Sequence, residues 1–227
     1  MIIRRFLIAC SLPPLLALTA CGRAPEHQLQ SHTAGDVDFS GSWELDYSQS
    51  DNIQAQLSAL VREMRRRAER QNRGGNQPGG SVALGNAGAG VIALAQMADY
   101  VTQSQLLDIN QDEEEILVKR EGNFALACKF VGAAITTEPG PLGSEACGWD
   151  GHQLLVRVYL PEDLTIQHRL TLGPSGERLN IATTVVSRQT GYPFTVNRVY
   201  NRFDPDADGI TCEQTLSRGR VCTTETQ

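Results

Sequence analysis

Apolar and polar residues alternate along most of the chain after Gln103, a pattern typical of strands with one buried face. The segment 103–130 predicts three strands, with turns at 111–113 and 121–123 and with inward positions at Leu107, Ile109, Ile116, Val118, Phe124, Leu126, Cys128 and Phe130. A Gly- and Pro-rich loop is expected at 132–148, three more strands within 149–187, and a last strand at 193–203. Short turns between consecutive strands predict an antiparallel meander.

A helix is predicted between this region and a first strand, which is marked by Phe39, Trp43 and Leu45. Ser50 or Asp51 is the expected N-cap and Gly74 the expected stop, and the apolar face has helical spacing: Ile53, Leu57, Leu60, Val61, Met64 and Ala68. The opposite face carries an excess of arginine over Glu63 and Glu69: Arg62, Arg65, Arg66, Arg67, Arg70 and Arg73. Such a face either contacts anionic lipid head groups or lipopolysaccharide, or is simply solvated.

The segment after this helix is rich in glycine and free of charge. Seven glycines lie between Gly74 and Gly90, and no charged residue occurs from Val82 to Ala98. We expect a flexible linker or loop here, followed by a short buried helix from Val91 to Tyr100. The stretch is too short and too glycine-rich to span a membrane.

These elements predict a mainly β fold: an antiparallel, barrel-like sheet with a helical, Gly-rich insertion. The expected organisation is a signal peptide (1–20), a polar tether (21–36), a β domain (37–203) that carries the insertion at 50–100, and a C-terminal tail (204–227).

The N-terminus has the features of an export signal. Arg4 and Arg5 precede an apolar run, and the sequence LTAC ends at Cys21. This ending resembles the lipobox of bacterial lipoproteins, in which the cysteine carries the lipid after cleavage. The resemblance implies lipidation of Cys21 with a palmitate-type acyl chain, and Gly22 after it implies the outer membrane, with the protein facing the periplasm. The expected partner is thus the membrane, through the lipid anchor.

Charge and cysteine content fit this location. Removing Arg4 and Arg5 with the signal leaves 18 basic and 26 acidic side chains, a net charge of −8, which argues against nucleic acid as a partner. Cys128, Cys147, Cys212 and Cys222 remain after Cys10 is cleaved off and Cys21 is acylated. Four cysteines in an oxidising compartment predict two disulfides with three possible connectivities, of which we favour the local pairs Cys128–Cys147 and Cys212–Cys222.

Two segments resemble a group of small exported bacterial β domains, lipocalin-like in outline. Ser40, Gly41, Trp43 and Leu45 match an opening SG-x-W-x-L, and Val196, Arg198, Val199, Tyr200 and Arg202 match a closing V-x-R-V-Y-x-R. A lipocalin-like resemblance implies a cavity for a small apolar ligand. The arginines of the last strand either bind an anion in the barrel mouth or form an outward polar face with Tyr200, and we favour the outward face.

The C-terminal segment DPDADGITCE resembles the end of the Excalibur module and the first half of an EF-hand loop. Alternating acids direct carboxylates onto one centre, and glycine permits the sharp bend that calcium ligation requires. The resemblance implies calcium as a possible cofactor, held by Asp204, Asp206, Asp208, Ile210 (through its carbonyl) and Glu213. Thr215 stands where an EF-hand has its bidentate Glu, so a plain acidic turn is the alternative.

The sequence contains no recognisable catalytic motif. HExxH, GxSxG, a phosphate-binding Gly loop and CxxC are all missing. His27 and His32 lie in the tether, His152 follows a turn, and His168 lies in a strand as a core or rim residue. We therefore expect no catalytic residues and no enzyme activity, but a role in binding an apolar small molecule or an envelope protein, or a structural role. A calcium-stabilised interaction module is the alternative, and an uncharacterised enzyme the third possibility.

Overall fold

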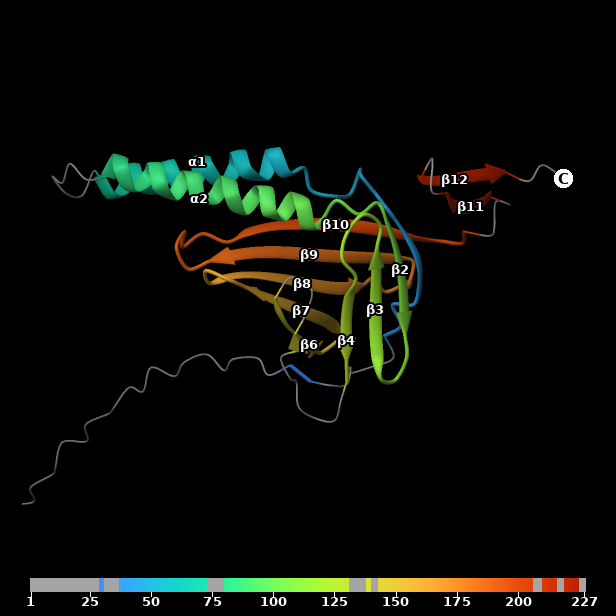
Figure 1. Ribbon diagram of the computed structural model, residues 1–227. Coiled ribbons are helices and arrows are strands. Elements are labelled where there is room, and N and C mark those ends of the chain that lie inside the picture. Colours follow the sequence, from blue (N-terminus) through green and yellow to red (C-terminus); the bar gives the residue numbers. More distant parts are fainter. Residues whose placement is uncertain are drawn as a thin grey trace, which may run out of the picture.

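The computed structural model describes residues 29–30, 37–72, 80–130, 138–139, 143–205, 210–215 and 219–224; at 71–72, 80–87, 138, 210–215 and 219–224 it describes the backbone alone. Within these residues, ten strands form one antiparallel sheet in the order β4-β3-β2-β1-β10-β9-β8-β7-β6-β5 (Figure 1). The strands are β1 (Gly41–Leu45), β2 (Leu106–Gln111), β3 (Glu115–Arg120), β4 (Leu126–Lys129), β5 (Glu138–Pro139), β6 (Ser144–Asp150), β7 (Gln153–Leu160), β8 (Leu164–Leu172), β9 (Arg178–Ser187) and β10 (Phe194–Phe203).

Pairing between the first and last strands of this sheet turns the meander into a nearly closed barrel. β1 pairs with β2 on one side and with β10 on the other, so the nine strands from β4 to β6 wrap around one core. The disulfide between Cys128 of β4 and Cys147 of β6 joins the two ends of this wrap, with the Cα atoms 5.7 Å apart. The predicted mainly β class, the barrel-like meander and this disulfide are confirmed.

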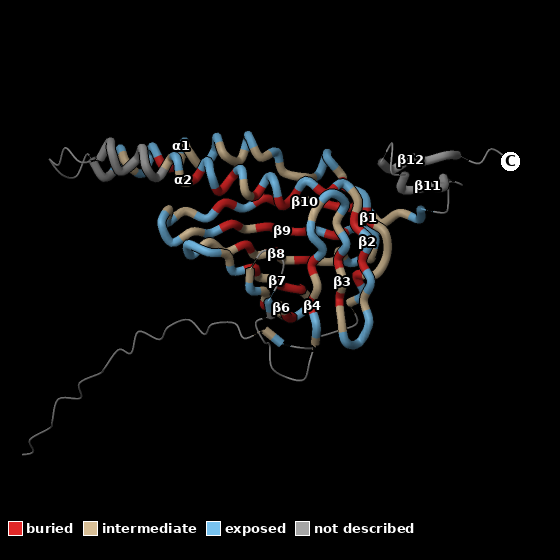
Figure 2. The backbone as a smooth tube through the Cα atoms, in the orientation of Figure 1, coloured by how far each residue is buried: buried red, intermediate tan, exposed pale blue. Residues whose placement is uncertain are grey.

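The interior is filled by side chains from alternate positions of the strands, and Figure 2 shows the buried residues recurring along β7 to β10. Phe39 and Trp149 stack inside the barrel with ring centroids 5.7 Å apart, and Phe130 stacks on Trp149 at 6.2 Å. Around them lies one apolar cluster, which includes Trp43, Leu107, Ile109, Ile116, Val118, Leu154, Val156, Leu170 and Leu179. Burying this much aromatic and aliphatic surface is the main force that holds a barrel together.

Two helices, α1 (Ile53–Asn72) and α2 (Gly80–Val101), lie between β1 and β2 in the sequence. They pack on each other and on the parts of β9 and β10 that are next to the β9–β10 turn (Figure 1). A second apolar cluster lies between the helices and the sheet: Met64, Val91, Leu94, Ala95, Ala98, Val101, Val158, Ile166, Val185, Phe194 and Val196. The register puts Leu179, Ile181, Thr183 and Val185 on one face of β9. The same sheet face therefore lines the barrel at one end and receives the helices at the other.

The cap of α1 differs from the prediction. Asn52 caps the helix, because its Oδ1 accepts a hydrogen bond from Ala55 N at 3.0 Å. Ser50 Oγ instead accepts from Val199 N at 2.9 Å, and Asp51 Oδ2 accepts from Asn197 N at 2.9 Å. The two expected caps are thus used to fasten the start of the helix to β10. Gly74, the expected stop, lies outside the described residues.

The second helix is longer than predicted, because α2 begins at Gly80 and not at Val91. The low helix propensity of glycine is outweighed here by tertiary packing, in which α2 lies along α1. Gly90 also has a packing role, since a side chain at this position would meet that of Thr190 in the β9–β10 turn. The glycine that suggested a loop lets the helix approach the sheet closely.

Three further expectations need correction, and one residue of the expected tether contacts the barrel. Part of the expected loop 132–148 is strand, since β6 begins at Ser144 and pairs with β7 in continuous register. Phe124 is exposed, since it precedes β4 and lies outside the alternation. The strand at 193–203 is not the last, because β11 (Ile210–Thr215) and β12 (Gly219–Thr224) follow it as a hairpin. Gln30, in the expected tether, pairs with Trp149 of β6 through backbone hydrogen bonds of 2.8 and 2.7 Å.

Candidate functional site

The predicted calcium ligands fall mostly outside the described residues. Asp204 is exposed after β10, Asp206 and Asp208 are not described, and Ile210 and Glu213 belong to β11, where the backbone alone is described. Among the described residues, no group of three or more His, Cys, Asp or Glu side chains could hold a metal ion. Calcium binding at this loop stays a prediction.

The C-terminal cysteines have a backbone arrangement that suits a disulfide. The register of β11 and β12 puts Cys212 directly opposite Cys222. The pairing of their side chains stays a prediction, and Cys21, the expected lipidation site, lies outside the described residues. Within the part of the chain that the structure describes, no helix is long and apolar enough to cross a membrane.

His168 is a buried core residue, as the strand pattern indicated. The residue is 3% exposed, and its ring Nδ1 lies 2.9 Å from Thr183 Oγ1. Burial, together with the positive charge of Arg120, lowers the pKa of His168 to about 3. The ring is therefore neutral at physiological pH. His152 is exposed in the turn after β6.

The predicted outward face of the last strand of the barrel is wrong, because Arg198, Tyr200 and Arg202 lie on its inner side. Arg198 pairs in register with Ile181 and Tyr200 with Leu179, and Tyr200 is buried. The polar groups of these inward side chains donate hydrogen bonds to backbone carbonyls. Arg198 Nη1 donates to Asp51 O at 3.0 Å and Tyr200 Oη to Ser104 O at 3.0 Å. Arg157 of β7 bonds a side chain and not a backbone carbonyl: its Nε donates to Gln167 Oε1 of β8 at 3.0 Å.

The two segments that carry the resemblance to exported β domains are neighbours in the sheet. Trp43 pairs with Arg202 and Leu45 with Tyr200. The Arg202 guanidinium lies over the Trp43 ring at 4.2 Å and donates to Ser40 O and to Gly176 O. The residues of both segments thus hold β1 and β10 together, which is a structural role.

A small cavity, lined by both apolar and polar side chains, lies where the barrel meets the C-terminal end of α2. Its volume is about 20 Å³, enough for a water-sized guest and too small for a lipid chain. Its polar lining is Thr102, Ser104, Arg120, His168, Thr183, Arg198 and Tyr200. Arg120 was not singled out in the sequence, although it follows Ile116 and Val118 at the inward spacing of β3, and a charged residue at that spacing is the signal that indicates it.

A larger cleft lies outside the barrel at the start of α1. Its volume is about 340 Å³, and it is lined by Tyr47, Ser50, Asp51, Asn52, Ile53, Gln54, Asp99 and Arg198. Arg198 thus reaches both the inner cavity and this cleft. The lining is polar and contains two acids, so the cleft is not an apolar ligand site.

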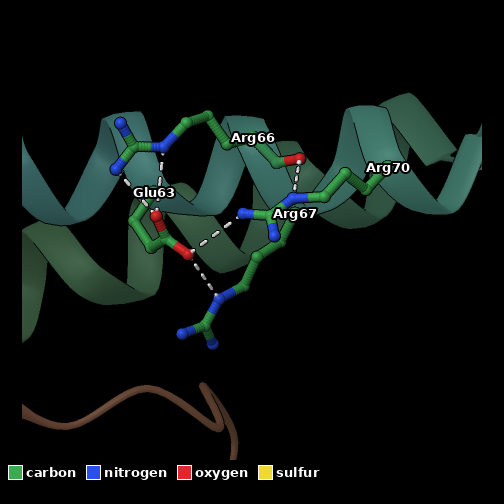
Figure 3. Close-up of polar contacts among 4 residues, drawn as sticks. All are labelled: Glu63, Arg66, Arg67 and Arg70. Carbon is green, nitrogen blue, oxygen red and sulfur yellow. Dashed lines mark hydrogen bonds and ion pairs between the residues drawn. The ribbon is translucent and has the colours of Figure 1, made fainter.

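The outer face of α1 is a basic surface, formed by Arg62, Arg65, Arg66, Arg67 and Arg70, all of them exposed. Figure 3 shows how Glu63 lies among three of these arginines: its carboxylate pairs with Arg66 at 2.7 Å, Arg67 at 2.9 Å and Arg70 at 3.6 Å. The hydrogen bonds from Arg66 and Arg67 lower the pKa of Glu63 below its usual value. One carboxylate cannot neutralise three guanidinium groups, so the surface keeps an excess of positive charge.

Packing explains only one of these arginines. Arg67 lies over the Tyr192 ring at 5.9 Å and so contacts the β9–β10 turn. Arg62 and Arg65 make no ion pair with another described residue within 4.0 Å.

Comparison of the chain with protein-family models, with curated proteins and with solved structures gives no match in any of the three. The functional proposal therefore rests on the geometry of this chain.

Proposed function

We propose that this chain is a lipid-anchored, non-catalytic protein of the bacterial outer membrane that binds anionic lipid head groups through the basic surface of α1. The observation that carries the proposal is the excess of exposed arginine on this helix in a chain whose net charge is −6. Charge of one sign gathered on one helix face, against the overall charge of the chain, is typical of a surface that meets a partner of the opposite sign.

The barrel interior gives little support to a carrier of apolar ligands. Aromatic and aliphatic side chains fill it, and the cavity at its edge has a volume of only about 20 Å³. Pockets for small organic ligands usually have volumes of about 300–1,000 Å³. In this proposal the barrel is a rigid scaffold that holds the helices.

Exposed apolar residues also suit the two helices to a membrane surface. α2 exposes Ile92 and Tyr100, whereas the exposed face of α1 is basic. Figure 1 shows the distal ends of both helices extending past the β9–β10 turn, where the sheet does not cover them. A helical element that exposes both basic and apolar residues is typical of a lipid interface.

The test is sedimentation of the chain from Gly22 onwards, which lacks the lipid anchor, with vesicles of phosphatidylglycerol and phosphatidylcholine or of phosphatidylcholine alone. We expect binding to the anionic vesicles that weakens with salt. A basic side chain near an anionic surface contributes about 1 kcal/mol, so the triple variant Arg62→Gln, Arg65→Gln, Arg70→Gln should bind about 100-fold more weakly.

The matched control removes three positive charges from exposed positions of the barrel strands β3, β4 and β9: Lys119→Gln, Lys129→Gln, Arg178→Gln. If both triple variants lose affinity equally, net charge and not the α1 surface is responsible. Equal binding of the native chain to both kinds of vesicle would refute the proposal, and capture of an acidic envelope protein through the same arginines would replace it with a protein partner.

A further inference from the structure

The cavity between the barrel and the helices is lined by two positive charges and by donors that lack acceptors. Ser104 Oγ and Arg198 Nε are buried and have no hydrogen-bond partner among the described residues. Ser104 is 2% exposed, and both residues line the cavity. A buried polar atom without a partner costs about 1–3 kcal/mol, so such a site favours a guest that accepts hydrogen bonds.

The second charge is Arg120, and its bonds leave part of the guanidinium free. Nε donates to Phe124 O at 2.7 Å and Nη1 donates to Val101 O at 3.1 Å. Burial lowers the pKa of Arg120 to about 10, which still leaves it charged at neutral pH. No ion pair within 4.0 Å joins Arg120 or Arg198 to a carboxylate of the described residues.

The charged groups around the cavity are therefore mainly positive. Glu145 of β6 is the acid that acts on Arg120, at longer range, and its own pKa is raised by burial. Asp51 and Asp99 lie with Arg198 on the outer cleft, where Asp51 Oδ2 is bonded by Asn197. The positive charge of Arg120 also acts on His168, because it adds to burial in lowering the pKa of that ring.

We propose that this cavity is a binding site for one small monovalent anion, of the size of chloride, held by Arg120, Arg198 and Ser104. A guest must be small, because the volume is about 20 Å³, and it must accept hydrogen bonds, because the guanidinium groups and the Ser104 hydroxyl donate them. A negative charge compensates two partly buried cations that form no ion pair with a carboxylate of the described residues, which a water molecule cannot do.

The site also has a consequence for the helices. Arg120 bonds the carbonyl of Val101 at the end of α2, and Arg198 bonds the carbonyl of Asp51 just before α1. An anion between the two arginines ties both ends of the helical pair to the barrel. It would hold the basic surface in place, but its existence does not depend on lipid binding.

The experiment is urea unfolding of the chain from Gly22 onwards, with its disulfides intact, in sodium chloride or in sodium gluconate at equal ionic strength. Gluconate is too large for the cavity. A ligand that binds only the folded state raises the folding equilibrium constant by the factor 1 + [L]/Kd, so chloride at ten times its Kd gives about an elevenfold rise. We expect this chloride effect in the native chain and a much smaller one in Ser104→Ala.

Two controls make the outcome decisive. The variant Arg62→Gln, Arg65→Gln should keep the full effect of chloride on stability, because the proposal assigns this effect to the cavity and not to anions adsorbed on α1. Crystals grown in bromide should show an anomalous peak within hydrogen-bonding distance of Arg120, Arg198 and Ser104. Equal stability in both salts, an unchanged effect in Ser104→Ala, or bromide at the surface alone would each overturn the proposal.

Discussion

The neutral state of His168 makes the stability of this protein depend on pH. The pKa of the ring is about 3 in the folded chain, first because the ring is buried and second because Arg120 is charged, whereas an unfolded histidine has a pKa of about 6.5. Between these values the unfolded chain binds a proton that the folded chain does not. Stability therefore falls as the pH falls from about 6.5 towards 3.

The magnitude is large compared with the stability of a domain. The slope from this one ring approaches about 1.4 kcal/mol per pH unit, and the difference between the two ends of the range is about 5 kcal/mol at most. A domain has a free energy of unfolding of about 5–15 kcal/mol. We expect His168 to contribute a main part of the acid sensitivity.

The assay is urea unfolding at a series of pH values from 7 to 4 for the native chain and for His168→Gln, which keeps a polar group near Thr183. The free energy of unfolding of the native chain should fall more steeply with acidification than that of the variant. His152→Gln, at an exposed turn, is the control and should follow the native chain. Parallel curves for the native chain and His168→Gln would show that the ring is not held neutral, and the argument would fail.

Two other predictions concern the closure of the barrel. Replacing Cys128 and Cys147 by serine removes a cross-link between residues 19 apart in the sequence. The free energy of unfolding, measured with urea, should fall by about 3 kcal/mol. An unchanged value would mean that the disulfide is not needed to hold β4 against β6. Gly41→Ala should cost about 1–3 kcal/mol, since Gly41 has a φ of 126° and faces Arg202, whereas Gly88→Ala, with open space around it, should not destabilise the chain.

Strand alternation predicted most of the barrel, because each strand has one face in the core. Leu107, Ile109, Ile116 and Val118 are buried as expected. The pairing of β1 with β10 does not follow from alternation, since it joins segments that are far apart in the sequence. The length of α2 was also not predictable, because its glycines are favoured by contacts with other elements, as Gly90 is by Thr190.

The site residues were harder to predict than the fold. Charge was taken to mark the solvent side of the last barrel strand, but Arg198 and Arg202 point inward and bond backbone carbonyls of loops that only the folded chain brings near. Arg120 had the inward spacing and was missed for the same reason. The arginines of α1 were identified correctly as an exposed face, because helical periodicity separates the two faces of a helix directly.

The most direct test of the proposed function is hydrogen exchange of the chain, with the proposed acyl anchor on Cys21, in vesicles with or without phosphatidylglycerol. The account predicts that anionic lipid slows exchange in α1, and that exchange in β7 to β10 stays the same, since the barrel is a scaffold. Slower exchange in the barrel strands with no change in α1 would contradict it.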